Sequence, residues 1–154
     1  MWQRIQTLFL GLLIVAMLGL LVLPIWVNQP DTPTEHQLYA LHYTEKAESS
    51  KSTFYFPYSI TAVLAVAAMV VSGISIKSYT NRPLQLRLGL LNSLLLLGVM
   101  ICVVVFVTDL AKSQPTGQYG PGFWLIAAAV ACNFLANRFI RKDQQLVKDS
   151  ERLR

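Results

Sequence analysis

The stretch LFLGLLIVAMLGLLVLPIWV, from Leu8 to Val27, contains twenty residues without a charge. A bilayer core about 30 Å thick needs roughly 20 apolar residues at a rise of 1.5 Å each. A helix also satisfies its own backbone hydrogen bonds, which lipid requires. This stretch therefore predicts a first transmembrane helix.

Three more apolar runs follow along the chain. Hydrophobic residues make up 54% of the sequence and charged residues only 14%, whereas about a quarter of the residues in a soluble domain are charged. We therefore predict an all-α membrane protein in which residues 1–154 form a single membrane domain, a four-transmembrane-helix bundle. Its spans run from about 8–27, 58–76, 88–108 and 122–140.

The N-terminal segment also has an alternative interpretation as a secretory signal peptide, since Arg4 precedes the apolar run. The run is, however, about twice as long as a typical signal-peptide core, and no small-residue cleavage site follows it. Trp26 fits an interfacial anchor, and Pro24 lies close enough to the end of the span to be tolerated. We favour a first span that is not cleaved.

Lysine and arginine residues are distributed unevenly between the two sides of the predicted bundle. The N-terminus, the segment 77–87 and the C-terminal tail carry ten of them, whereas the other two loops carry Lys46, Lys51 and Lys112. The positive-inside rule therefore places both termini in the cytoplasm. This asymmetry also accounts for the net charge of +5, so no nucleic-acid partner is expected.

The loops offer weaker signals. In the first outer loop, β-compatible residues at 37–44 and 53–58 flank a polar stretch, which is compatible with a short β-hairpin. The second outer loop, 114–122, is rich in turn-forming residues. Apolar residues recur every three to four positions in the tail, 141–154, and predict a cytoplasmic tail helix. The alternative is a solvated charged end.

Four polar residues fall inside the third and fourth runs. Asn92 and Asn137 lie at similar depths when counted from the inner ends of their spans, and polar side chains at matched depth can form hydrogen bonds between helices. We therefore predict an Asn92–Asn137 contact. The alternative is a polar lining along a substrate path. The full set of candidate interhelical contacts is Asn92, Ser93, Asn133 and Asn137.

Other reactive residue types do not form recognisable sites. His36 and His42 are six positions apart, which matches neither a helical chelate nor a zinc-binding spacing. Cys102 and Cys132 lie at depths that differ by about 6 Å and are expected to be packing residues. Asp109 is expected at the outer edge of its span as an interfacial cap. We predict no catalytic residues, cofactor or metal, and hence a protein that is not an enzyme.

Three polar segments carry a family resemblance: MWQRIQTL at 1–8, NRPLQLRL at 81–88 and ANRFIRKDQQLVKDSERLR at 136–154. Together they resemble the domain-of-unknown-function 4293 family of small four-span proteins from Bacteroidota. The tail departs from the family pattern at Gln144, where a glutamate is usual. The resemblance implies a bacterial inner-membrane protein and brings no established activity.

These observations favour a non-enzymatic accessory or assembly subunit of a larger membrane complex. Its expected partners are the lipid bilayer and other membrane proteins or copies of itself. Two alternatives remain: a component of a small-molecule or lipid transporter or channel, and a membrane enzyme acting on lipid, for which only the loop around His36 offers residues. The candidate contacts to partner acids or anionic headgroups are Arg82, Arg87, Arg138, Arg141, Lys142, Arg152 and Arg154.

Overall fold

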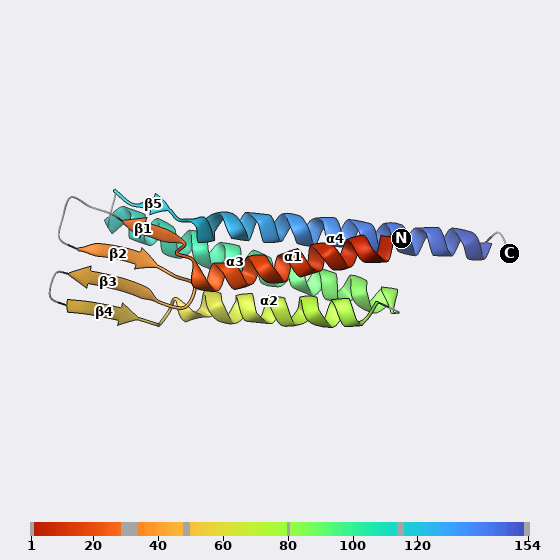
Figure 1. The fold of residues 1–154 in the computed structure, drawn as a ribbon, viewed down its shortest axis with the longest axis horizontal. Coiled ribbons are helices and arrows are strands. Elements are labelled where there is room, and N and C mark those ends of the chain that lie inside the picture. The colour runs from red at the N-terminus through yellow and green to blue at the C-terminus, as the bar shows by residue number, and fades with distance from the viewer. Residues whose placement is uncertain (1, 29–33, 48–49, 80, 114–115, 153–154) are drawn as a thin grey trace.

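Four helices lie side by side, and a small β-sheet extends from one end of them (Figure 1). The computed structural model describes residues 2–28, 34–47, 50–79, 81–113 and 116–152. The helices are α1 (Trp2–Val22), α2 (Ser59–Lys77), α3 (Arg82–Ser113) and α4 (Pro121–Arg152). We use "sheet end" for the end that carries the sheet, and "tail end" for the opposite end, where α1 begins and α4 ends.

Each helix contains a segment that is long and apolar enough to cross a membrane, which confirms the prediction of four apolar helices. The fourth helix continues without a break through the predicted tail helix as far as Arg152. The apolar segments are Ile5–Val22, Ser59–Lys77, Pro83–Ser113 and Pro121–Leu146.

The predicted first span is wrong at its C-terminal end. The helix ends at Val22 rather than Val27, and Trp26–Asn28 form a strand instead. Pro24 explains the break, because proline lacks a backbone N–H and its ring clashes with the preceding helical turn. Hydrophobicity alone does not separate a short buried strand from the last turn of an apolar helix.

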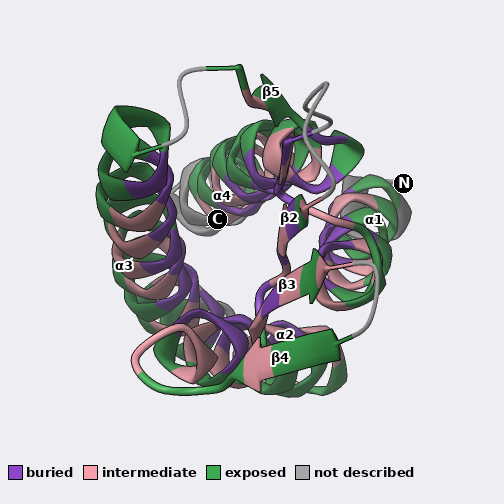
Figure 2. Ribbon diagram, turned by 90° about the vertical axis from the view of Figure 1, so that its left-hand side faces the viewer, coloured by how far each residue is buried: buried purple, intermediate pink, exposed green. Residues whose placement is uncertain are grey.

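The helices form a ring in the order α4, α1, α2, α3 (Figure 2). The first helix packs more extensively on α4 than α3 does. Large apolar side chains also face outward over much of the surface: Val15, Leu94 and Phe134 are 64%, 59% and 66% exposed. Water disfavours such a continuous apolar surface, whereas lipid accommodates it. The buried centre is formed by Leu13, Met17, Leu20, Leu96, Val99, Val103 and Ile126.

The sheet is larger than the predicted hairpin. All its strands are antiparallel, in the order β4-β3-β2-β1-β5. A hairpin does form, but it pairs Tyr43 with Phe54 and Ala47 with Ser50, so the predicted strand boundaries were wrong. The turn-rich second loop supplies a strand that pairs with β1. The strands are β1 (Trp26–Asn28), β2 (Glu35–Leu38), β3 (Tyr43–Ala47), β4 (Ser50–Phe54) and β5 (Gln118–Tyr119).

Backbone contacts join the sheet to the helices. Gly120 N–H donates to the Ile25 carbonyl at 2.8 Å, and Gly122 N–H donates to the Pro24 carbonyl at 3.0 Å. A Cβ atom at either glycine would collide with backbone atoms of the segment that follows α1. Only glycine therefore allows the start of α4 to approach this segment so closely.

Trp26 lies inside this junction. Its side chain is 2% exposed, and a Cβ atom at Gly117 would collide with its indole ring. The predicted interfacial anchor is thus at the expected end of the first helix, but its ring packs inside the protein rather than facing headgroups.

Candidate functional site

Hydrogen bonds between polar side chains connect three of the four helices near the middle of the bundle. The buried Asn92 amide on α3 donates to Ser72 Oγ on α2 at 3.0 Å and to Asn133 Oδ1 on α4 at 3.2 Å. Asn133 in turn donates to Ser93 Oγ at 2.8 Å. These bonds satisfy the donating amide N–H groups in an apolar environment and hold α2, α3 and α4 in one register, whereas the buried Asn92 Oδ1 has no hydrogen-bond partner among the described residues.

Asn137 extends this network by one helical turn toward the tail end. Its amide donates to the Gly89 carbonyl at 3.2 Å and to Ser93 Oγ at 3.4 Å. The predicted Asn92–Asn137 contact is therefore wrong in register, since Asn92 reaches Asn133. Depth counted from the end of the fourth apolar run gives the wrong register, because α4 continues past Ile140 as one helix and has no boundary there.

Sequence reasoning missed two members of this network. Ser72 accepts a hydrogen bond from Asn92, yet in the sequence it is one small residue in an apolar helix. At Gly89, an added Cβ atom would collide with the Asn137 amide. The absence of a side chain there lets α4 place its amide against the α3 backbone, and only the pairing of the two helices identifies this role.

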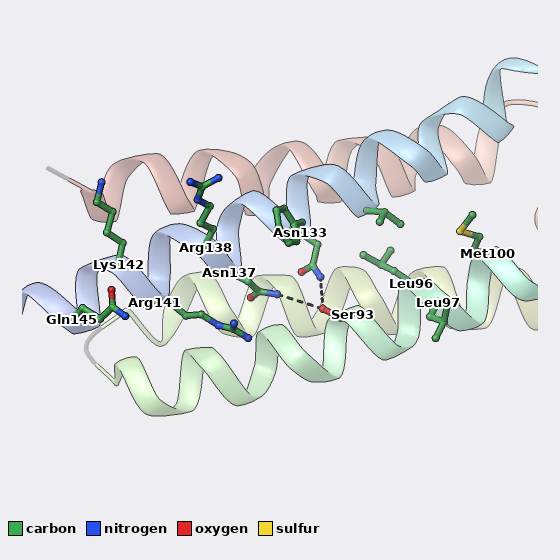
Figure 3. A pocket seen from close by; sticks show the side chains of 12 residues that line it. Ser93, Leu96, Leu97, Met100, Asn133, Asn137, Arg138, Arg141, Lys142 and Gln145 are labelled. Atoms are coloured by element: carbon green, nitrogen blue, oxygen red, sulfur yellow. Dashed lines mark hydrogen bonds between the residues drawn. The ribbon is translucent and has the colours of Figure 1, made fainter.

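A groove of about 730 Å³ runs between α3 and α4 beside the amide network (Figure 3). Leu97, Met100 and Phe134 are 52%, 47% and 66% exposed, so its apolar part opens sideways rather than into the centre of the bundle. Ser93, Asn133 and Asn137 form its polar middle. The full lining is Ser93, Leu96, Leu97, Met100, Val130, Asn133, Phe134, Asn137, Arg138, Arg141, Lys142 and Gln145.

Three of the predicted basic contacts line the tail end of this groove. Arg138, Arg141 and Lys142 share one side of α4 because helical residues three and four apart are neighbours. In Figure 3, Arg141 extends from α4 toward α3. Arg87 is exposed on α3 but does not line the groove. The side chains of Arg82 and Arg152, and all of Arg154, lie outside the described residues.

His36 lies in β2, and His42 lies in the turn just before β3. His36 Nδ1 and the Tyr43 hydroxyl are 2.7 Å apart. Burial and, to a lesser degree, the nearby Lys51 ammonium lower the pKa of His42. Burial, with smaller contributions from Glu45 and Tyr58, raises the pKa of Tyr43 to about 12. Across the described ranges, no three His, Cys, Asp or Glu side chains are close enough to hold a metal ion.

The remaining candidates do not line the groove. Cys102 and Cys132 are both free thiols at half-buried positions. Asp109 is exposed near the sheet end of α3. None of these residues lines the groove.

The class of protein follows from these features: a bundle of four apolar helices, held together by interhelical amides, with a small sheet at one end and a basic groove toward the other. The chain belongs to the family described as Domain of unknown function (DUF4293), whose sequence model matches residues 2–153. The resemblance carried by the three polar segments is thereby confirmed. A comparison with curated proteins finds no match.

Proposed function

We propose that this protein is a non-enzymatic accessory or assembly subunit of a larger complex in a bacterial inner membrane. The observation that carries the proposal is the open edge of the sheet at β4. One side of β4 pairs with β3, and it is the last strand in the order of the described sheet. Its residues are mostly exposed. An unpaired strand edge is a ready template for a strand from another protein.

An aromatic ridge adjoins this edge. Phe54, Tyr55 and Phe56 are 51%, 58% and 80% exposed. Phe54 ends β4, and the other two lie between the sheet and the start of α2, where a membrane surface would meet the protein. Exposed aromatic residues are enriched in the centres of protein interfaces because they bury a large area. The edge and the ridge together support a partner that adds a strand and covers the three rings.

The positive charge of Lys51 on β4 favours a partner strand that carries an acidic residue. Lys51 lies opposite Lys46 across the hairpin, and Lys46 is 3.9 Å from Glu35. A lysine on an edge strand discourages random pairing. A partner strand with an acidic residue beside Lys51 would complement it, whereas a strand without one would not.

The distribution of basic residues supports an orientation for the complex. The segments richest in lysine and arginine are those at the tail end, whereas Lys46, Lys51 and Lys112 belong to the sheet end. By the positive-inside rule, the tail end faces the cytoplasm and the sheet faces the opposite compartment. The β4 edge would then recruit its partner outside the cytoplasm.

A site-specific photo-cross-linker tests this function. With the probe at Ser52 of β4, the expected result is a cross-linked partner that also co-purifies in mild detergent and is identified by mass spectrometry. The matched control places the same probe at Leu41, which is also exposed in the sheet region but outside β4. Recovery of a lone monomer, or equal cross-linking from both positions, would contradict the proposal.

The groove favours a second candidate, a carrier or channel component for small molecules or lipids. The Asn133 amide of the groove already bonds to Asn92 and Ser93 of α3, and Asn92 bonds to Ser72 of α2. These bonds support a holding role more than a continuous polar path. Flux through liposomes containing the protein tests this candidate. Flux that is unchanged by Asn92→Leu, Asn133→Leu and Asn137→Leu would exclude it.

A further inference from the structure

The groove between α3 and α4 changes character along its length. Toward the sheet end its walls are apolar and include Leu97, Met100 and Val130. The amides of Asn133 and Asn137 follow, and the basic residues come last, at the tail end. A ligand that matches all three zones has an apolar body, a polar connecting region and an anionic head.

The length of the groove matches one leaflet of a bilayer. Arg141 follows Val130 by eleven residues within the continuous helix α4, which corresponds to about 16 Å of axial rise. Half of a hydrocarbon core about 30 Å thick is close to the same distance. A lipid with its headgroup at the basic end would therefore extend its chain along the apolar walls.

The charge of the groove selects an anion. Arg138, Arg141 and Lys142 line it, and no acidic residue is among the lining side chains that the structure describes. Arginine presents a planar fork of N–H donors that matches phosphate oxygens. Arg141, which extends toward α3 in Figure 3, is placed to donate across the groove, whereas Arg138 and Lys142 extend from α4 to the side away from α3.

The apolar walls distinguish a lipid from a free anion. Leu97 and Phe134 are more than half exposed and open toward the surrounding membrane, so a lipid can enter sideways without leaving its leaflet. A free phosphate would use only the basic end. The volume of about 730 Å³ also falls in the range of ligand sites, about 300–1,000 Å³.

We propose that this groove binds an anionic phospholipid of the leaflet at the tail end. Its phosphate contacts Arg141 across the groove, Arg138 and Lys142 add positive charge at the same end, and one acyl chain lies along Leu97 and Phe134. The site is independent of the proposed partner at β4, which lies at the opposite end of the molecule. Variants that abolish lipid binding in the groove would therefore leave partner binding at β4 intact, and the reverse also holds.

The test measures retention of phosphatidylglycerol and phosphatidylcholine by the purified full-length protein, using native mass spectrometry. The triple variant Arg138→Gln, Arg141→Gln, Lys142→Gln should retain phosphatidylglycerol on the order of a hundredfold more weakly, since each basic residue near the surface contributes to anionic-lipid binding. Its retention of phosphatidylcholine should not change.

A charge-matched control removes three positive charges at the sheet end with Lys46→Gln, Lys51→Gln and Lys112→Gln. This variant should retain phosphatidylglycerol like the natural protein. Equal losses in the two triple variants would overturn the proposal in favour of nonspecific attraction. Equal retention of the two lipids by the natural protein would overturn it as well.

A second pair of variants tests the apolar wall without changing charge. Leu97→Asn should weaken phosphatidylglycerol retention, whereas Leu94→Asn should not, because Leu94 is 59% exposed on the same helix but does not line the groove. Displacement of the lipid by millimolar inorganic phosphate would assign the site to a free anion and overturn the lipid proposal. Resistance to phosphate would support the lipid.

Discussion

The sheet end and the α3–α4 groove differ in how closely their parts pack. At the sheet end, three glycines let backbone and ring atoms approach closely, and Trp26 fills the junction. At the groove, α3 and α4 meet through hydrogen-bonded amides and leave space beside them. This small bundle is therefore closely packed at the sheet end and has an open groove toward the tail end.

The largest expected effect on stability comes from removing the buried indole at the sheet end. Trp26→Ala should reduce the free energy of unfolding by about 3–5 kcal/mol, because it leaves a cavity where a fully buried indole stood. Thermal unfolding in detergent measures the loss. Trp124→Ala is the control, since that ring is 66% exposed, and its effect should stay within about 0.5 kcal/mol. Similar losses for both variants would contradict the buried junction.

Adding a side-chain atom at the sheet end should reduce the free energy of unfolding by a smaller amount. Gly120→Ala places a Cβ atom against the Pro24 carbonyl, and overpacking of this kind typically costs about 1–3 kcal/mol. Gly73→Ala is the matched control, because nothing lies within 4 Å of its added Cβ atom and alanine is the better helix former. The same unfolding assay should show a lower midpoint for Gly120→Ala only. An unchanged midpoint would mean that the junction can yield.

The amide network beside the groove should contribute still less to the free energy of unfolding. A double-mutant cycle of Asn92→Leu and Asn133→Leu should give a coupling energy near 0.6 kcal/mol and no more than about 1.7 kcal/mol, the range of hydrogen bonds between membrane helices. The corresponding cycle of Asn92 with Asn137 should give a smaller coupling, since no hydrogen bond joins these two described side chains directly. A larger coupling for the second pair would restore the register predicted from the sequence.

The smallest expected effect is a pH dependence of the sheet. The folded state lowers the pKa of His42 below its ordinary value of 6.5, so folding favours the neutral ring. The resulting stability is fully present above about pH 6.5 and is lost as the pH falls through the folded-state pKa. The ring lies among Lys51, Tyr39 and Tyr55. His42→Gln should flatten the dependence of the unfolding midpoint between pH 7.5 and roughly 5, and an equally steep profile in this variant would contradict the assignment.

Several features of the fold could be predicted from composition alone. Four apolar runs of about twenty residues, three of them without a charge, predict four apolar helices, because a helix needs about that length to cross the hydrocarbon core. The family could likewise be predicted from local segments, since its polar motifs are contiguous in the chain. Both inferences depend on short-range information.

The sheet was only partly predictable. The hairpin of β3 and β4 is local, and its β-compatible residues signal it, although its boundaries were misplaced. The pairing of β1 with β5 joins Trp26 to Tyr119, far apart in the sequence. A two-residue strand in a turn-rich loop has no periodicity of its own. Its conformation follows from the partner that the folded bundle brings beside it.

By itself, the sequence determined the number of apolar helices, the family and the residue types available to the groove. Only the tertiary structure decided that Asn92 meets Asn133, that Trp26 is buried and that three tail-end cations share a groove with apolar walls. The physical reason is that hydrophobicity acts on each segment separately, whereas register and groove shape depend on how two helices pack. The sequence of a continuous helix such as α4 does not show which of its residues lie level with a given residue of another helix. The packing of the neighbouring helices decides this.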